Sequence, residues 1–308
     1  MRINTNISSL GAQEAAKNTN NSIASSLEKL STGLRINKAS DDASGLAIAD
    51  KLRTQVTSIN QGISNGNSAI ALLQIADKSM AEQSKILDTV KSKLIQANTD
   101  TTSTAGRVAI AKDVTKLLTQ LNNIASQTNY NGTNLLQKSP ATSGGGAGSS
   151  LRAASAGGQG KLSFQIGESK NDMIKTQSIQ SNTWGLKLTS LGKAAATAAG
   201  MSVGAIGKAG SIFSRGVASA QQKNVNDAIT RLNSYRGDIG STQNQVESAV
   251  RNLMTQSTNI KAAESIIRDI DYAEESATFN KLNIISQAGS YAISQSNATQ
   301  QNVLRLLQ

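Results

Sequence analysis

Residues 225–270 read VNDAITRLNSYRGDIGSTQNQVESAVRNLMTQSTNIKAAESIIRDI. Every seventh residue of this stretch is a large aliphatic: Val225, Leu232, Ile239, Val246, Leu253, Ile260 and Ile267. The positions three residues further along are more often small or polar: Ala228, Tyr235, Thr242, Ala249, Gln256, Ala263 and Ile270. A seven-residue apolar repeat predicts one long helix in coiled-coil-like packing, and small side chains in its seam favour close approach of a neighbour.

The first half of the chain offers the neighbours that this helix needs. Between residues 43 and 97, mostly apolar residues recur at helical spacing: Ala49, Leu52, Val56, Ile59, Ile63, Gly66, Ile70, Leu73, Met80, Leu87 and Leu94. After Gly106 the pattern resumes with Ile110, Val114, Leu117, Leu121 and Ile124, and it ends at the turn signal Asn131-Gly132. We expect a second long helix, a shorter antiparallel partner, and packing of the C-terminal helix on both, which brings the chain's ends together.

The middle of the chain changes character. Residues 139–160 are rich in Gly, Ser and Ala, hold the single proline, and are expected to form a loop. Residues 161–179 alternate polar and apolar around a turn at 167–172, which predicts a β-hairpin. Residues 181–219 are too few for an independent core and are expected to form a small outward-facing region. The expected fold is mainly α, with long antiparallel helices, a small β-hairpin and amphipathic helices at both termini.

The two terminal segments carry apolar stripes that nothing nearby in the sequence covers. The residues that we expect to drive self-assembly are Ile3, Ile7, Leu10, Ile23, Leu27, Leu30 and Leu34 near the start and Phe279, Leu282, Ile285, Leu304 and Leu307 near the end. Gly33 is placed to end the first helix, and Asp271 with Glu274 is a candidate capping box for the last. A subunit can cover such stripes by heterologous contacts with copies of itself, and contacts of this kind that do not close generate helical filaments.

Composition narrows the function further. The chain has no His and no Cys, which removes an imidazole base, a thiol nucleophile and the usual zinc ligands. Its net charge of +11 is spread along the chain, without a basic cluster or interleaved aromatics, so nucleic-acid binding is disfavoured. No apolar run is long enough for a signal peptide or a membrane span, so neither a Sec signal nor a transmembrane helix is expected. No catalytic residue, metal or cofactor is expected.

Four strings together resemble the bacterial flagellins: MRINTN (1–6), LSTGLRINKASDDASGLAIA (30–49), QTNYNGTNLL (127–136) and NVLRLLQ (302–308). The resemblance covers residues 1–138 and 221–308 and departs only in the middle. It implies a subunit of the extracellular flagellar filament, the propeller for swimming, that is secreted without a cleaved signal peptide. It also implies an inner coiled-coil domain of residues 1–42 and 269–308, a helical core domain of residues 43–180 and 220–268, and a variable region of residues 181–219.

The same resemblance implies several partners. These are copies of the chain itself, the flagellar type III export apparatus, a secretion chaperone bound near the C-terminus, a filament cap and the hook-junction proteins. Many flagellins are also sensed by a vertebrate Toll-like receptor through one stretch of the long helix. The matching residues here are Leu87, Thr89, Val90, Ser92, Lys93 and Gln96, and the changes at Thr89, Ser92 and Lys93 predict weakened recognition.

Two other classes compete with a filament subunit. A hook–filament junction protein, or another helical structural protein of a secretion system, would share the heptad pattern but resemble flagellins only loosely at the ends. A surface-binding or enzymatic protein on a coiled-coil stalk would need its chemistry in residues 139–220, where no nucleophile and base are paired. The terminal strings favour the filament subunit.

Overall fold

The fold is mainly helical, as the sequence predicts. A computed structural model describes residues 6–137, 161–200 and 213–306. The chain divides into two compact units. Residues 1–57 and 256–308 form the first, called here the terminal unit, and residues 58–255 form the second, called the central unit. The helices α2 (Ala43–Ala97) and α6 (Arg215–Arg268) run through both, and α2 has the bounds that its apolar pattern predicts.

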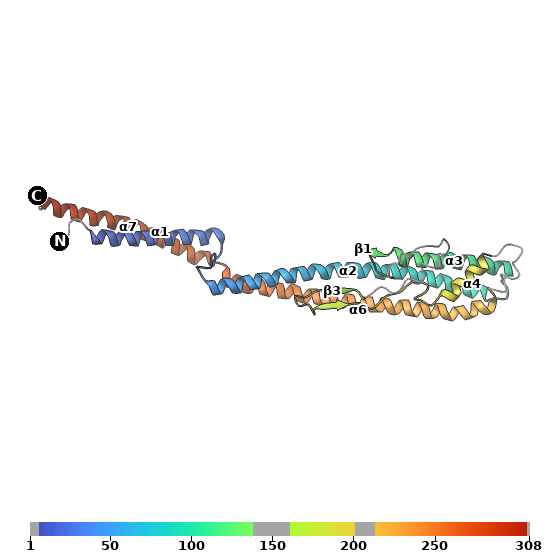
Figure 1. Ribbon diagram of the computed structural model, residues 1–308. Coiled ribbons are helices and arrows are strands. Elements are labelled where there is room, and N and C mark those ends of the chain that lie inside the picture. The colour runs from blue at the N-terminus through green and yellow to red at the C-terminus, as the bar shows by residue number, and fades with distance from the viewer. Residues whose placement is uncertain (1–5, 138–160, 201–212, 307–308) are drawn as a thin grey trace, which may run out of the picture. The chain divides into compact units, whose positions relative to one another are not determined.

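In the terminal unit, α1 (Ile7–Thr32) lies beside α7 (Tyr272–Leu306) (Figure 1). Gly33 ends α1 in the left-handed region at a φ of 73°, and its N–H donates to the carbonyl of Lys29, so the predicted stop is confirmed. The connections that follow α1 and precede α7 pair through an isolated bridge between Leu34 and Asp269. Asp271 caps α7 by accepting the N–H groups of residues 273 and 274.

The central unit contains α3 (Thr104–Gln127), α4 (Thr189–Ala199) and two small hairpins. The predicted turn at Asn131 and Gly132 joins β1 (Asn129–Tyr130) to β2 (Thr133–Asn134), and both turn residues have positive φ. The predicted hairpin pairs β3 (Ser163–Gln165) with β4 (Met173–Lys175) in antiparallel register.

The core of the central unit is built from the heptad positions. Val225, Leu232, Ile239 and Val246 of α6 are at most 2% exposed. Val225, Leu232 and Ile239 belong to one buried cluster with residues of α2 and α3, and Val246 extends the buried stripe of α6 by one heptad. The α2 and α3 residues of this cluster include Leu73, Met80, Leu87, Leu94, Val114 and Leu121. The same stripe of α6 is only half-buried at Ile260 and Ile267, which lie in the terminal unit.

The segment after the hairpin differs from the sequence-based expectation. Leu186, Leu188 and Leu191 are at most 1% exposed and pack in the main core cluster, as do Ala195 and Ala198. Residues 181–199 therefore have no independent core, but they contribute buried side chains to the main core cluster instead of only facing outward. The physical reason is that α4 packs on α3 and shares its core, so it needs none of its own. Its orientation in an assembly stays a prediction.

The β3–β4 hairpin packs directly against α2 at Gly62. A Cβ added to Gly62 would lie 1.9 Å from the carbonyl oxygen of Ile166, and Asn65 one turn later donates to the carbonyl of Gln165 at 3.1 Å. A side chain at position 62 therefore has no room unless the hairpin moves.

We expect Gly62→Ala to lower the free energy of unfolding by about 1–3 kcal/mol, the typical cost of overpacking. Gly237→Ala in α6 is the matched control, because nothing lies within 4 Å of its added Cβ. That control should raise the stability by about 0.5–1 kcal/mol, since alanine replaces glycine inside a helix. Thermal unfolding of both variants measures these changes in stability, and equal effects would contradict the close packing of the hairpin on Gly62.

Candidate self-assembly surface

The pairing of α1 with α7 follows a coiled-coil seam in both helices. Positions of reduced exposure on α1 recur at spacings of three and four: Ser9, Ala12, Ala16, Thr19, Ile23, Ser26 and Leu30. The corresponding positions on α7 are Glu275, Phe279, Leu282, Ser286, Gly289, Ile293 and Ser296. This spacing is typical of knobs-into-holes packing. We call the pair the terminal coiled coil.

Contacts along the seam establish an antiparallel register. Near one end, the Nδ2 of Asn6 donates to the carbonyl and hydroxyl oxygens of Ser296, both at 3.3 Å. In the middle, a Cβ at Gly289 would lie 4.0 Å from the Cβ of Ala16. Toward the other end, the hydroxyl of Ser26 donates to Oε1 of Glu275. Residues later in α1 therefore contact residues earlier in α7, which is the antiparallel arrangement.

This seam is unusual because most of its members are small or polar. The residues of α1 that are buried are both serines, Ser9 and Ser26. A two-stranded coiled coil that is stable in water normally places large aliphatics at these positions. Small residues let the two helices approach closely but bury little apolar surface, so the terminal coiled coil has little hydrophobic stabilisation of its own.

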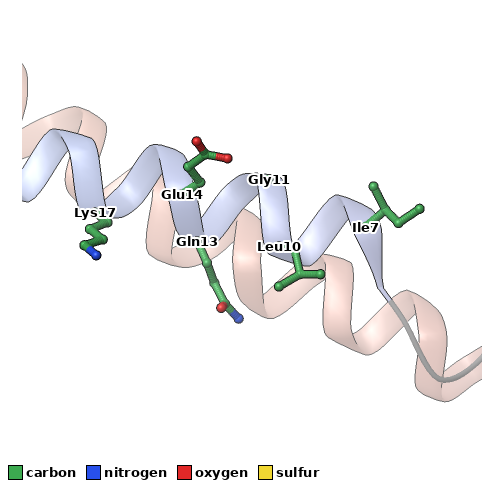
Figure 2. A pocket seen from close by; sticks show the side chains of 6 residues that line it. All are labelled: Ile7, Leu10, Gly11, Gln13, Glu14 and Lys17. Atoms are coloured by element: carbon green, nitrogen blue, oxygen red, sulfur yellow. The ribbon is translucent and has the colours of Figure 1, made fainter.

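Large apolar side chains lie outside the seam instead. On α1, Ile7 is 72%, Leu10 54% and Leu27 55% exposed. On α7, Ile284, Ile285 and Tyr291 are 67%, 43% and 73% exposed. We call these six residues the outer apolar face. Ile7 and Leu10 line an open hollow of about 630 Å³ on α1, together with Gly11, Gln13, Glu14 and Lys17 (Figure 2).

The structure thus separates the expected assembly residues into two groups. Ile23, Leu30, Phe279 and Leu282 take part in the seam, and Leu34 is half-buried and forms the backbone bridge with Asp269. Ile7, Leu10, Leu27 and Ile285 point away from the seam and are exposed. Ile3 and Leu307 lie outside the described residues, as does the side chain of Leu304.

Two exposed apolar residues of α7 are not among those that the sequence pattern predicts. Ile284 and Tyr291 lie seven positions apart and form a second stripe beside the one that contains Phe279 and Leu282. The signal in the sequence is this second apolar stripe, which is missed when only one apolar stripe is assigned to the helix.

The link between α1 and α2 is held by charged groups. Lys38 forms an ion pair with Glu28 at 2.6 Å, and Oδ2 of Asp41 accepts the N–H groups of Asn37 and Lys38 at 3.1 and 2.9 Å. The bonds from Lys38 and Asn37 hold the pKa of Asp41 below its ordinary value of 3.8. The hydrogen bond and charge of Glu28 raise the pKa of Lys38 above its ordinary 10.5.

These shifts predict how the link responds to pH. The stabilisation of the folded link by Asp41 is fully present above the pKa of Asp41 in the unfolded chain, and it is lost as pH falls through the lower pKa of the folded state. The stabilisation by Lys38 is fully present below 10.5, and it is lost as pH rises through the higher pKa of Lys38 in the folded state. Hydrogen-exchange protection of the Asn37 and Lys38 amides should therefore hold at neutral pH and decline in strong acid. Asp41→Asn removes the titrating carboxyl and should flatten the acid decline, whereas the same decline in both proteins would contradict this role.

The proposed receptor segment is divided by the fold. Leu87 and Val90 are fully buried in the core cluster, so they cannot contact a receptor unless the core opens. Thr89, Ser92 and Gln96 are exposed, and Lys93 is half-buried with its Nζ 3.1 Å from Asp113. The sequence matched these residues as one stretch, but only the polar ones reach the surface.

Within the described parts of the chain, no group of three His, Cys, Asp or Glu side chains is arranged to hold a metal ion. Over the same residues, no helix is both long and apolar enough to cross a membrane.

Comparison with known proteins gives a consistent result. Residues 3–141 match the bacterial flagellin N-terminal helical region, and residues 222–307 match the bacterial flagellin C-terminal helical region. The chain is 34% identical to a flagellin of Bacillus subtilis over the full length of both proteins. It is 31% identical to flagellin FlaB2 of Treponema pallidum, again over 100% of each. A solved structure described as a flagellar hook-associated protein of Vibrio parahaemolyticus shares the fold, with a TM-score of 0.56 and 10% identity over 74% of this chain and 99% of that one.

Proposed function

The chain belongs to the bacterial flagellin family and is a structural subunit of the flagellar filament, and we propose that it polymerises through its terminal coiled coil. The family matches run along the whole chain, whereas the likeness to a hook-associated protein concerns the fold alone. A junction protein is therefore not favoured.

One observation carries the proposed assembly mode: most seam positions of the terminal coiled coil hold small or polar residues, while six large apolar side chains lie outside the seam. Ser9 and Ser26 are buried while Ile7, Leu10 and Tyr291 are more than half exposed. This arrangement is unfavourable for a helix pair in water and favourable for one surrounded by other helices. Identical neighbours can supply those helices in a helical polymer.

The domain roles follow as further proposals. Residues 1–42 and 269–308 would form the inner part of the filament, residues 43–180 and 220–268 a surrounding layer, and residues 181–219 the outward-facing part. The family is one of structural proteins, and we propose a mechanical role without catalysis.

We also propose partners that act before and during assembly. The flagellar type III export apparatus, a secretion chaperone near the C-terminus, the filament cap and the hook-junction proteins are the expected set. The exposed apolar side chains of α7, such as Ile284 and Tyr291, support a chaperone because such a surface aggregates if left uncovered.

Recognition by a vertebrate Toll-like receptor is proposed to be weak. Of the six matched residues, Thr89, Ser92 and Gln96 remain exposed, and none of these three is an arginine or a large apolar anchor. A receptor-reporter assay on depolymerised protein tests this, and potency equal to that of a flagellin with an arginine-rich segment would contradict it.

Seeded polymerisation tests the function itself. Purified subunits added to short filament fragments should elongate them, as seen by electron microscopy and light scattering. Subunits from which the first and last forty residues or so have been trimmed should not elongate them, because the outer apolar face is gone. Elongation by the trimmed protein would refute assembly through the terminal coiled coil.

A further inference from the structure

Asparagine followed by glycine occurs twice in the chain, at Asn65-Gly66 and at Asn131-Gly132. This dipeptide is chemically labile in water, because glycine has no side chain to obstruct its own backbone nitrogen. That nitrogen can attack the side-chain amide carbon of the asparagine and expel ammonia. The two dipeptides have the same chemistry, so the structure around each one decides which of them reacts.

The first dipeptide is held inside a helix. Asn65 and Gly66 lie within α2, where each backbone N–H donates to the carbonyl four residues earlier. The side-chain amide of Asn65 is bonded at both ends, because Nδ2 donates to the carbonyl of Gln165 at 3.1 Å and Oδ1 accepts from Nε2 of Gln61 at 3.0 Å. Gly66 is buried, and a Cβ added to it would clash with Val250. Reaction here requires α2 to open.

The second dipeptide forms the turn between β1 and β2. Asn131 and Gly132 have φ of 49° and 78°, and both residues are exposed. Nothing lies within 4 Å of a Cβ added to Gly132. No hydrogen bond of the Asn131 side chain is found to any described residue. The reacting groups of this dipeptide are therefore accessible to water and have open space around them.

Ring closure requires the Asn131 backbone to leave the left-handed region, so that its side-chain carbon can reach the nitrogen of Gly132. The hairpin is well suited to such local opening, because β1 and β2 pair through two residues each and a two-stranded hairpin is only marginally stable by itself. Below the strands, the N–H of Leu135 donates to the carbonyl of Thr128 at 3.1 Å, and Leu135 is buried. The turn can therefore open without unfolding the core.

We propose that Asn131 is a site of spontaneous covalent modification, namely deamidation to aspartate and isoaspartate. The Gly132 nitrogen gives up its proton and attacks Cγ of Asn131, a C–N bond forms, and the bond from Cγ to Nδ2 breaks. Nδ2 takes up a proton and leaves as ammonia. Water is the one co-reactant: it opens the resulting cyclic imide at Cγ to give aspartate, or at the backbone carbonyl carbon to give isoaspartate. Nothing is oxidised or reduced.

The modification changes both the charge and the backbone of the turn. Either product adds a carboxylate, and isoaspartate also adds a main-chain carbon between Tyr130 and Thr133. The longer connection no longer matches a two-residue hairpin turn, so the Leu135 amide should exchange with solvent faster in modified subunits. The reaction needs no enzyme and no polymerisation, and the modified fraction increases with the age of the protein.

Peptide mapping of the full-length subunit after incubation in mildly alkaline buffer tests the proposal. Trypsin separates the two dipeptides into residues 54–78 and 117–138. The second peptide should gain the mass difference between an amide and a carboxyl group, fragmentation should place it at residue 131, and an isoaspartyl methyltransferase should label it. Asn131 should react at least about tenfold faster than Asn65, because a short surface hairpin opens at lower free energy than a packed helix. Equal rates in the folded protein, or an unchanged Asn131, would overturn the proposal.

Two controls separate the effect of the fold from that of the dipeptide. In denaturant, where helix and turn are both lost, Asn131 and Asn65 should react at similar rates, and a persistent difference would contradict selection by the fold. Asn131→Gln keeps the amide but must close a larger and less favourable ring, so labelling of its peptide should disappear. Residue 131 is exposed, and thermal unfolding of the variant should stay close to that of the parent. Undiminished labelling of the variant would overturn the assignment to Asn131.

Discussion

Leu10→Asp is expected to abolish polymerisation at any ordinary protein concentration. Leu10 is 54% exposed on α1 and lines the hollow beside Ile7. If a neighbouring subunit covers it, the substitution removes up to about 1.5–3 kcal/mol of apolar burial and adds the cost of burying a charge. A loss of about 3 kcal/mol per subunit contact raises the critical concentration more than a hundredfold.

The control for this variant is Asn21→Asp, which adds the same charge at an exposed position of α1 with almost no change in shape. It should polymerise like the parent. The helical content and thermal unfolding of the Leu10→Asp monomer should change little, because Leu10 is more than half exposed and lies outside the seam. Normal elongation of seeds by the Leu10→Asp variant would contradict the role of the outer apolar face in assembly.

A disulfide between positions 16 and 289 is expected to lock the terminal coiled coil. The Cβ of Ala16 and an added Cβ at Gly289 would be 4.0 Å apart, within the range that disulfides require. The parent has no cysteine, so Ala16→Cys with Gly289→Cys introduces the only pair. Closing so long a loop stabilises the folded state by about 5 kcal/mol in the chain-entropy estimate.

The locked monomer should resist proteolysis at both termini, whereas the reduced form should be trimmed there. It should also elongate seeds at least as fast as the parent, because the helix pair is already formed. Ala15→Cys with Gly289→Cys is the matched control, since residue 15 is exposed and outside the seam. Equal cross-linking of both pairs would contradict the single antiparallel register, and a locked monomer unable to elongate seeds would contradict assembly of the pair as seen here.

The central unit could be predicted largely from local pattern. The stripes from Met80 to Leu94 and from Val225 to Val246 become the core, and the hairpins form where alternation and turn residues indicate them. These features depend on residue spacing within one segment, which the sequence displays directly.

The assembly surface could be predicted only in part. The sequence indicates apolar stripes on both terminal helices, and Ile7, Leu10, Leu27 and Ile285 are indeed exposed. It could not show that Ile23 and Phe279 would enter the seam, because that depends on which face of α1 meets which face of α7. This pairing is set by contacts between residues far apart in the sequence, such as Asn6 with Ser296, which are 290 positions apart.

The helices, the turns and the presence of uncovered apolar surface can thus be predicted from the sequence, because each is a property of residue spacing along the chain. The approach of distant segments places Ser9, Ser26 and Gly289 in the seam, leaves Ile284 and Tyr291 exposed, and brings Leu186 and Leu188 into the core. The physical reason is that periodicity reveals a stripe but not its partner. Whether small residues or large ones meet depends on how closely two distant backbones approach.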